Sequence, residues 1–182
     1  GSGIAQSFAS NNFKVLLHDI SNDMLSKAFD TINKSLDRMI NKEIITREKA
    51  NSSLKNITTS TSTDIMNNCD LIIEAATENI DIKKKIFKKL DYLSKPSCIL
   101  ASNTSSISIN ELADSTNRPS MVIGMHFMNP VPIMKLVEII KTTKTSKETL
   151  ETVVNTAIKL GKKPVECIDS PGFISNRILM PM

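Results

Sequence analysis

Three side-chain types that carry out acid–base chemistry occur together between Ala101 and Ile140. Hydroxyl groups cluster around Ser105, one of the chain's two histidines is His126, and Glu138 lies in an apolar run. Imidazole gains and loses a proton near neutral pH, and a carboxylate on its second nitrogen fixes the tautomer and stabilises the cation. These residues therefore indicate a general base, its partner, and a hydroxyl that could hold the oxygen losing its proton.

Two short apolar segments surround the histidine and the glutamate. Residues 121–125 precede His126, residues 133–137 precede Glu138, and an Asn-Pro dipeptide followed by a further proline lies between them. This pattern predicts two strands joined by a tight loop that bring His126 and Glu138 face to face. The alternative is a hydrogen-bonded histidine at a strand end and a glutamate on an edge strand, with no catalytic role.

The first nineteen residues carry part of a nucleotide-binding pattern. Small residues beginning with Gly1 open an expected helix, and the apolar strand at 13–19 ends in Asp19. In the second half of a dinucleotide-binding βαβ unit, the helix N-terminus faces the pyrophosphate and the acid binds the ribose hydroxyls. Gly1 and Asp19 are therefore candidate cofactor ligands, and the charge of Asp19 favours NAD over NADP. The alternative is a close-packed helix start that binds no ligand.

Helical and strand-like segments alternate along the rest of the chain. Apolar spacing predicts helices at 21–41, 47–54, 81–93 and 146–160, and strands at 56–62, 69–76, 97–103 and 163–169. This order predicts an α/β fold of the doubly wound Rossmann type, with a mostly parallel sheet and ligands at the carboxyl ends of its strands. Asp19, Glu78, Asn103 and Ser105 all follow such strands.

Lysines occupy one side of the expected helix at 81–93. They are Lys83, Lys84, Lys85, Lys88 and Lys89, opposite an apolar face that begins with Ile82. A run of this kind usually forms a solvated helix face. We therefore expect these lysines to be exposed.

Composition excludes several classes of function. The 182 residues carry a net charge of +4, only 4% aromatic residues and no tryptophan, which speaks against a nucleic-acid-binding surface. No apolar run approaches the roughly 18 residues that a membrane span requires. The three cysteines lie far apart without metal-ligand spacing, so we expect reduced thiols, a cytoplasmic location and no metal site.

The turn Ser170-Pro171-Gly172 predicts a domain boundary. Residues 1–169 would form the nucleotide-binding domain, and residues 170–182 would begin a second, helical domain. Both ends of the sequence read as the interior of longer motifs. We therefore expect the chain to be a fragment that lacks the first strand and most of the second domain.

Four segments resemble the L-3-hydroxyacyl-CoA dehydrogenase family, and most closely its short bacterial 3-hydroxybutyryl-CoA dehydrogenases. They are GSGIAQ, ASNTSS, GMHFMNPVPIMKLVEII and DSPGFISNRIL, and the resemblance covers essentially the whole chain. Two departures from the family pattern are the absence of its first strand with two fingerprint glycines, and the loss of most of its C-terminal helical domain. In the family that domain forms the homodimer and closes over the substrate.

The resemblance implies a role for each residue of the acid–base cluster. His126 would be the general base that takes the proton of the substrate's 3-hydroxyl, and Glu138 would be its partner. Ser105 would hydrogen-bond the reacting oxygen beside the nicotinamide. Asn176 would orient the substrate from the domain junction.

The resemblance also implies ligands for NAD and for an acyl-CoA substrate. Asp19 would bind the adenosine ribose, Gly1 belongs to the fingerprint, and Glu78, Lys83 and Asn129 would contact other parts of NAD. Ser35 and Lys42 would contact coenzyme A. Two rival classes are a non-catalytic dinucleotide-binding protein or inactive fragment, and a β-hydroxyacid dehydrogenase with a lysine base.

Overall fold

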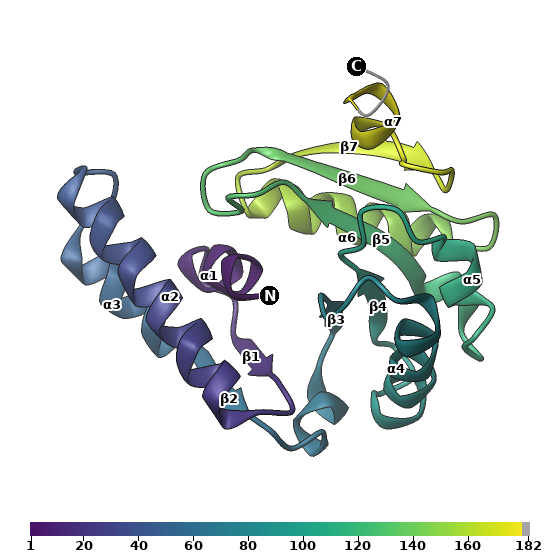
Figure 1. The fold of residues 1–182 in the computed structure, drawn as a ribbon, viewed down its shortest axis with the longest axis horizontal. Coiled ribbons are helices and arrows are strands. Elements are labelled where there is room, and N and C mark those ends of the chain that lie inside the picture. Colours follow the sequence, from purple (N-terminus) through teal and green to yellow (C-terminus); the bar gives the residue numbers. More distant parts are fainter. Residues whose placement is uncertain (180–182) are drawn as a thin grey trace. The chain divides into compact units, whose positions relative to one another are not determined.

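The computed structural model describes residues 1–179, which fold as two compact units (Figure 1). The first unit comprises residues 1–65 together with 129–133. The second comprises residues 66–128 and 134–179. The predicted boundary near residue 170 stays a prediction, and residues 180–182 of the predicted second domain lie outside the described part.

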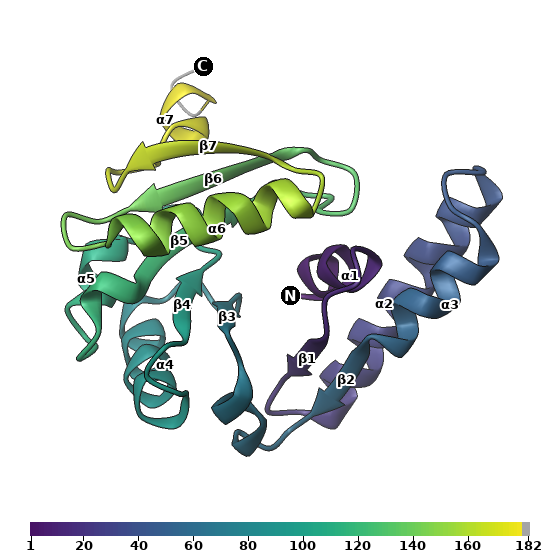
Figure 2. The ribbon, with the colours of Figure 1, turned by 180° about the vertical axis from the view of Figure 1, so that it is seen from behind.

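The first unit is a two-stranded parallel sheet with three helices. In chain order the elements are α1 (Ser2–Ser10), β1 (Val15–His18), α2 (Asn22–Asn41), α3 (Arg47–Lys55) and β2 (Ile57–Ser60). Helix α1 packs against β1, α2 and α3. Helices α2 and α3 lie side by side (Figure 2). The strand at 13–19 and the helix at 21–41 thus form close to their predicted limits.

Helix α2 begins and packs as its sequence predicts. The Ser21 hydroxyl caps the helix by accepting a hydrogen bond from the Met24 N–H at 3.4 Å. Ile32 and Leu36, four residues apart, are buried with Ala5 and Ala9 of α1 in one apolar cluster. The small side chains of α1 are therefore in contact with helices as well as with β1.

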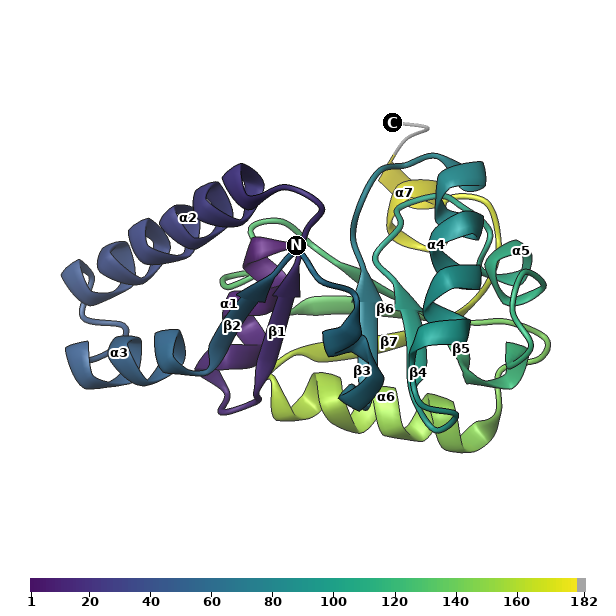
Figure 3. The same cartoon turned by 90° about the horizontal axis from the view of Figure 1, so that it is seen from below.

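The second unit contains a five-stranded sheet in the order β3-β4-β5-β6-β7 (Figure 3). Every neighbouring pair is parallel except β5 and β6, which are antiparallel. This confirms the predicted α/β fold with a mostly parallel sheet. After the 3-10 helix η1 (Asp64–Asn68), the elements are β3 (Leu71–Glu74), α4 (Ile80–Leu93), β4 (Ile99–Ser102), α5 (Ile109–Ala113), η2 (Pro119–Met121), β5 (Val122–Phe127), β6 (Leu136–Lys141), α6 (Lys147–Lys159), β7 (Lys163–Ile168) and α7 (Ser175–Leu179).

Helices cover both faces of this sheet. Leu100, Val122 and Ile140 belong to the cluster that also contains apolar residues of α4 and α5. Their strand neighbours, which include Ile139, point to the opposite face because side chains alternate along a strand, and α6 packs there against β5, β6 and β7. Both faces are therefore largely buried along β4, β5 and β6, which leaves the strand ends as the main place for exposed polar side chains.

A buried ion pair fixes the end of α4 next to the segment that leads into β5. The Arg118 Nε atom donates to Asp91 Oδ1 at 2.6 Å, and a further Arg118 nitrogen donates to the Lys95 carbonyl at 2.6 Å. The Asn117 N–H also donates to Asp91, at 2.8 Å. Burial raises the pKa of Asp91, but the hydrogen bonds from Asn117 and Arg118 and the arginine charge outweigh it, so the pKa lies below its usual value.

We predict that Asp91→Asn lowers the free energy of unfolding at pH 7 by about 1–3 kcal/mol, because charged hydrogen bonds are lost in a buried site. The folded-state pKa of Asp91 is depressed, so its contribution is complete above the unfolded value near 4 and is lost as the pH falls through the folded value. In urea unfolding, the difference in the free energy of unfolding between Asp91→Asn and wild type should be smaller at about pH 3 than at pH 7.

Asp70→Asn is the matched control, because the Asp70 carboxylate is 94% exposed in its pair with Lys95. It should change stability much less than Asp91→Asn. Equal effects of the two substitutions would contradict the stabilising role of the buried pair between Asp91 and Arg118.

Candidate active site

His126 and Glu138 are cross-strand partners on β5 and β6. The His126 Nδ1 and Glu138 Oε2 atoms are 2.7 Å apart, and the two side chains are 12% and 1% exposed. The predicted face-to-face arrangement is therefore correct. Both residues lie within their strands rather than after them, since the antiparallel ladder runs from Gly124 to Phe127 and passes through the pair.

Glu138 is held from a second side by the start of α7. Its Oε1 atom accepts hydrogen bonds from the backbone N–H groups of Ile174 at 3.0 Å and Ser175 at 2.7 Å. Burial raises the pKa of Glu138, but the hydrogen bonds from His126 and from these two amides outweigh it, so the pKa is below its ordinary value. The carboxylate is therefore ionised at neutral pH despite its burial.

The charge of Glu138 determines which nitrogen of His126 carries the proton. An ionised carboxylate only accepts hydrogen bonds, so the neutral imidazole must donate from Nδ1. Nε2 then bears the lone pair, and no protein group within residues 1–179 is hydrogen-bonded to it. The arrangement is that of a general base whose tautomer is fixed by its partner.

Ser105 and Glu78 meet at the carboxyl ends of β3 and β4. The Ser105 N–H donates to Glu78 Oε1 at 2.7 Å, the Ser105 hydroxyl donates to the same atom at 3.1 Å, and the Thr104 hydroxyl donates to Oε2 at 2.7 Å. Burial raises the pKa of Glu78, but these hydrogen bonds and the charge of Lys83 lower it below its usual value. The glutamate thus fixes the loop that carries Ser105.

Asn176 connects the Ser105 loop to the helix that holds Glu138. Its Nδ2 atom donates to the Ser105 carbonyl at 2.9 Å, and it directly follows Ser175, whose amide binds Glu138. The four residues predicted to be catalytic, His126, Glu138, Ser105 and Asn176, therefore belong to one hydrogen-bonded assembly in the second unit. Their catalytic roles remain predictions.

The expectation of a solvated lysine face is wrong at Lys83. This residue is 1% exposed, and its Nζ atom contacts both carboxylate oxygens of Glu74, at 2.8 and 2.6 Å. Ile82, expected on the apolar face, is 45% exposed instead. The reason is electrostatic: Glu74 ends β3 at 5% exposure, and a buried carboxylate requires a cation or several donors.

The sequence reasoning missed Glu74 and Ser102 as parts of the site's framework. Glu74 also accepts hydrogen bonds from the Ala76 N–H at 2.7 Å and from the Ser102 hydroxyl at 2.8 Å. A charged residue that closes the apolar run LIIE was the available signal, because such a residue needs a partner when the strand is buried. The identity of that partner depends on packing.

In the first unit, Asp19 immediately follows β1. Its Oδ1 atom accepts a hydrogen bond from the Ser21 N–H at 3.1 Å, which fixes the turn into α2. Gly1 is the N-cap of α1 and provides no side-chain cap, so its helix terminus retains free N–H groups. A Cβ at Gly1 would meet nothing within 4 Å, whereas one at Gly3 would lie 3.1 Å from Val131 Cβ. The close approach therefore occurs at Gly3.

The other predicted ligands of this unit lie on or near its surface. Ser35 is in α2 and half-buried, Lys42 is the exposed C-cap of the same helix, and Asn129 is exposed. Seven residues separate Ser35 from Lys42, which puts them on one side of α2 about two turns apart. Such a spacing suits joint contact with one extended ligand.

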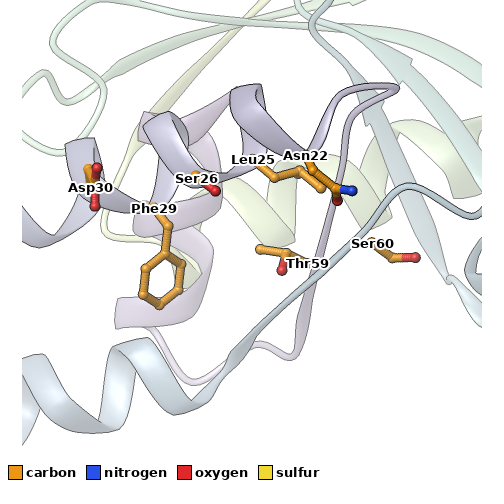
Figure 4. Close-up of a pocket in the computed structure, with 7 residues that line it drawn as sticks. All are labelled: Asn22, Leu25, Ser26, Phe29, Asp30, Thr59 and Ser60. Atoms are coloured by element: carbon orange, nitrogen blue, oxygen red, sulfur yellow. The ribbon is translucent and has the colours of Figure 1, made fainter.

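A pocket of about 540 Å³ lies in the first unit between α2 and β2 (Figure 4). It is lined by Asn22, Leu25, Ser26, Phe29, Asp30, Thr59 and Ser60. None of the predicted site residues is among them.

Within residues 1–179 there is no cluster of three or more histidines, cysteines or acidic residues suited to a metal ion. No described helix has both the length and the apolar composition needed to cross a membrane.

A mostly parallel sheet covered by helices, with polar side chains gathered at its strand ends, defines a nucleotide-binding α/β protein of the Rossmann class. The chain belongs to the 3-hydroxyacyl-CoA dehydrogenase family, since residues 1–170 match the family model described as "3-hydroxyacyl-CoA dehydrogenase, NAD binding domain". This confirms the resemblance drawn from the motifs, and with it the assignment to an NAD-binding domain.

Individual relatives agree with the family match. The probable 3-hydroxybutyryl-CoA dehydrogenase of Deinococcus radiodurans is 48% identical over 182 residues, which cover 100% of this chain and 65% of that protein. The mitochondrial hydroxyacyl-coenzyme A dehydrogenase of Sus scrofa is 43% identical over 187 residues, covering 100% and 60%. The crystal structure of (S)-3-hydroxybutyryl-CoA dehydrogenase from Ralstonia eutropha has a TM-score of 0.98 and 48% identity, covering 100% and 64%. The chain thus spans 60–65% of the length of these relatives.

We predict that Lys83→Met destabilises the protein by about 3–5 kcal/mol at pH 7, because it leaves the buried Glu74 carboxylate without its cation. The double variant Lys83→Met/Glu74→Gln should recover part of this loss, since it also removes the buried charge. Urea unfolding measures both changes.

Lys84→Met provides the matched control. Lys84 is the next residue and pairs with Glu111, but these side chains are 34% and 57% exposed. Its loss should cost at most about 1 kcal/mol. A Lys83→Met variant no less stable than Lys84→Met would contradict the importance of the buried pair.

Proposed function

We propose that this chain is the NAD-binding part of an enzyme that interconverts (S)-3-hydroxyacyl-CoA, with 3-hydroxybutyryl-CoA as the favoured substrate, and the corresponding 3-ketoacyl-CoA. The observation that carries the proposal is the 2.7 Å contact between His126 Nδ1 and an ionised, buried Glu138. A lysine-based dehydrogenase would not need this pair. The names of the relatives supply the substrate class.

His126 would act as the general base toward the 3-hydroxyl group. A secondary alcohol does not ionise near pH 7, so departure of hydride from C3 requires removal of the hydroxyl proton. Nε2 of His126 would accept that proton, and the Glu138 carboxylate would stabilise the resulting imidazolium through Nδ1. In the reverse direction, the same ring would return the proton to the ketone oxygen.

Ser105 and Asn176 would orient the reacting oxygen. The Ser105 hydroxyl donates to Glu78 at 3.1 Å, a long contact that a closer acceptor could replace. Asn176 binds the Ser105 carbonyl through Nδ2, so its Oδ1 is available for a ligand donor. These groups support positioning of a substrate hydroxyl or carbonyl.

The residues present fit NAD as a cofactor. The uncapped N-terminus of α1 at Gly1 suits a pyrophosphate, and Asp19 at the end of β1 suits ribose hydroxyls. Bound NAD would supply the hydride acceptor, which is chemistry that no side chain provides. Glu78, Lys83 and Asn129 are proposed to contact other parts of NAD; Lys83 would do so while paired with Glu74.

The coenzyme A portion of the substrate is proposed to contact Ser35 and Lys42. An exposed ammonium and a hydroxyl about two turns apart on one side of α2 suit a phosphate-bearing carrier. A homodimer formed through the C-terminal helical domain of the complete protein and a cytoplasmic location also remain predictions; the relatives include bacterial and mitochondrial proteins.

The complete protein should reduce acetoacetyl-CoA with NADH, followed as the loss of NADH absorbance. His126→Gln and Glu138→Gln should each lower kcat about 10²- to 10⁴-fold, because proton transfer loses its base or the partner of that base. The dissociation constant for NADH, measured by fluorescence titration, should stay unchanged.

Glu166→Gln is the matched control for Glu138→Gln, since Glu166 is an exposed glutamate on the neighbouring strand β7. It should retain the wild-type kcat. Wild-type rates in both His126→Gln and Glu138→Gln would remove this pair from the mechanism, and an inactive complete protein would favour the non-catalytic alternative.

Asp19→Ala should lower the preference for NAD over NADP about tenfold or more, because a carboxylate at this position repels the 2′-phosphate. The measurement is the ratio of kcat/KM for NADH and NADPH with acetoacetyl-CoA. Asp23→Ala, which removes an exposed acid in the first turn of α2, should leave the ratio unchanged. An unchanged ratio in Asp19→Ala would show that another residue selects the cofactor.

A further inference from the structure

Asn103 joins the carboxyl ends of three strands. It directly follows β4, and its own N–H donates to the Glu74 carbonyl at the end of β3, at 2.8 Å. Its side-chain oxygen, Oδ1, accepts a hydrogen bond from the Phe127 N–H at the end of β5, at 2.9 Å.

The contact with Phe127 lies where the strand pairing stops. The register of β4 and β5 ends at Ser102 and Gly124, while β5 itself continues to Phe127. Phe127 is 3% exposed, and an unpaired N–H in such a place costs about 1–3 kcal/mol. The Asn103 side chain therefore supplies the acceptor that β4 no longer provides.

We infer that Asn103 is a positioning residue for the proposed general base: its amide oxygen fixes the end of β5 and thereby keeps the His126 ring on Glu138. This inference rests on the proposed role of His126. The Phe127 nitrogen belongs to the planar peptide unit that begins at the His126 Cα atom. A hydrogen bond that fixes this plane therefore also restrains the Cα atom from which the imidazole side chain projects.

The two members of the pair are thus held independently. Glu138 is fixed by the amides of Ile174 and Ser175, and His126 is fixed by the hydrogen bond between Asn103 and Phe127. Misplacement of a catalytic group by about 1 Å can lower a rate by about 10²-fold. A mobile end of β5 should therefore lower kcat more than it lowers the free energy of unfolding.

The chemistry of the contact provides a matched set of variants. An N–H donor requires an oxygen acceptor, so Oδ1 of Asn103 must face Phe127. Aspartate retains an oxygen at that position, and alanine removes it. Asn110→Ala is the control, because Asn110 Oδ1 also accepts a backbone N–H, from Thr143 at 3.3 Å, away from the His126 pair.

In the complete protein, Asn103→Ala should lower kcat about 10- to 100-fold while the KM for NADH stays unchanged. Asn110→Ala should retain the wild-type kcat, even where its melting temperature falls as far as that of Asn103→Ala. The inference would be overturned if kcat fell in proportion to the melting temperature in both variants, because lost stability alone would then explain the lower activity.

NMR without ligand separates this inference from the proposed function. In Asn103→Ala the Phe127 amide should exchange with solvent faster than in wild type, and in Asn103→Asp it should stay protected. The Nδ1–H signal of His126 should shift or broaden in Asn103→Ala, because its hydrogen bond to Glu138 is disturbed, whereas the ring signals of His18 should not change. These NMR changes in a protein without dehydrogenase activity would reject the proposed function and retain the positioning role. An active protein in which Asn103→Ala leaves kcat and the His126 Nδ1–H signal unchanged would overturn the role of Asn103.

Discussion

A carboxylate buried in a protein must be surrounded by donors, because burial without them costs several kcal/mol. The site in the second unit depends on this requirement at Glu138. One oxygen accepts from His126, and the other accepts from the Ile174 and Ser175 amides. The glutamate therefore selects the tautomer of the histidine and also anchors the start of α7. A single buried charge thus connects the proposed chemistry to the packing of the C-terminal helix.

The same requirement is met differently at the neighbouring strand ends. Glu74 is neutralised by Lys83 and bound by Ser102, whereas the more accessible Glu78 is bound by Thr104 and Ser105. The buried ion pair of Glu74 with Lys83 holds this carboxylate in one place, whereas a ligand could replace the hydroxyl donors of Glu78. Glu74 therefore supports the surrounding structure, and Glu78 is the candidate cofactor contact.

The antiparallel pair within a mostly parallel sheet has a consequence for the site. In a parallel pair, the carboxyl ends of both strands lie at the same edge of the sheet. In the antiparallel pair of β5 and β6, the end of β5 instead lies beside the beginning of β6. His126 therefore approaches the end of β5 while Glu138 lies near the middle of β6. The two residues lie directly opposite each other, and the burial of Glu138 at 1% exposure strengthens the interaction of its carboxylate with the ring.

The sequence by itself determined the α/β class, the helix at 21–41, and the meeting of His126 with Glu138, because apolar periodicity and a proline-containing turn are local signals. Its motifs were also sufficient to indicate the family. The tertiary structure alone decided that Lys83 is buried rather than solvated, that the close glycine contact is made by Gly3, and that Asn103 supports Phe127. These features depend on which groups from distant segments become neighbours when water is excluded, and no local pattern encodes the partner of a buried charge or the end of a strand register.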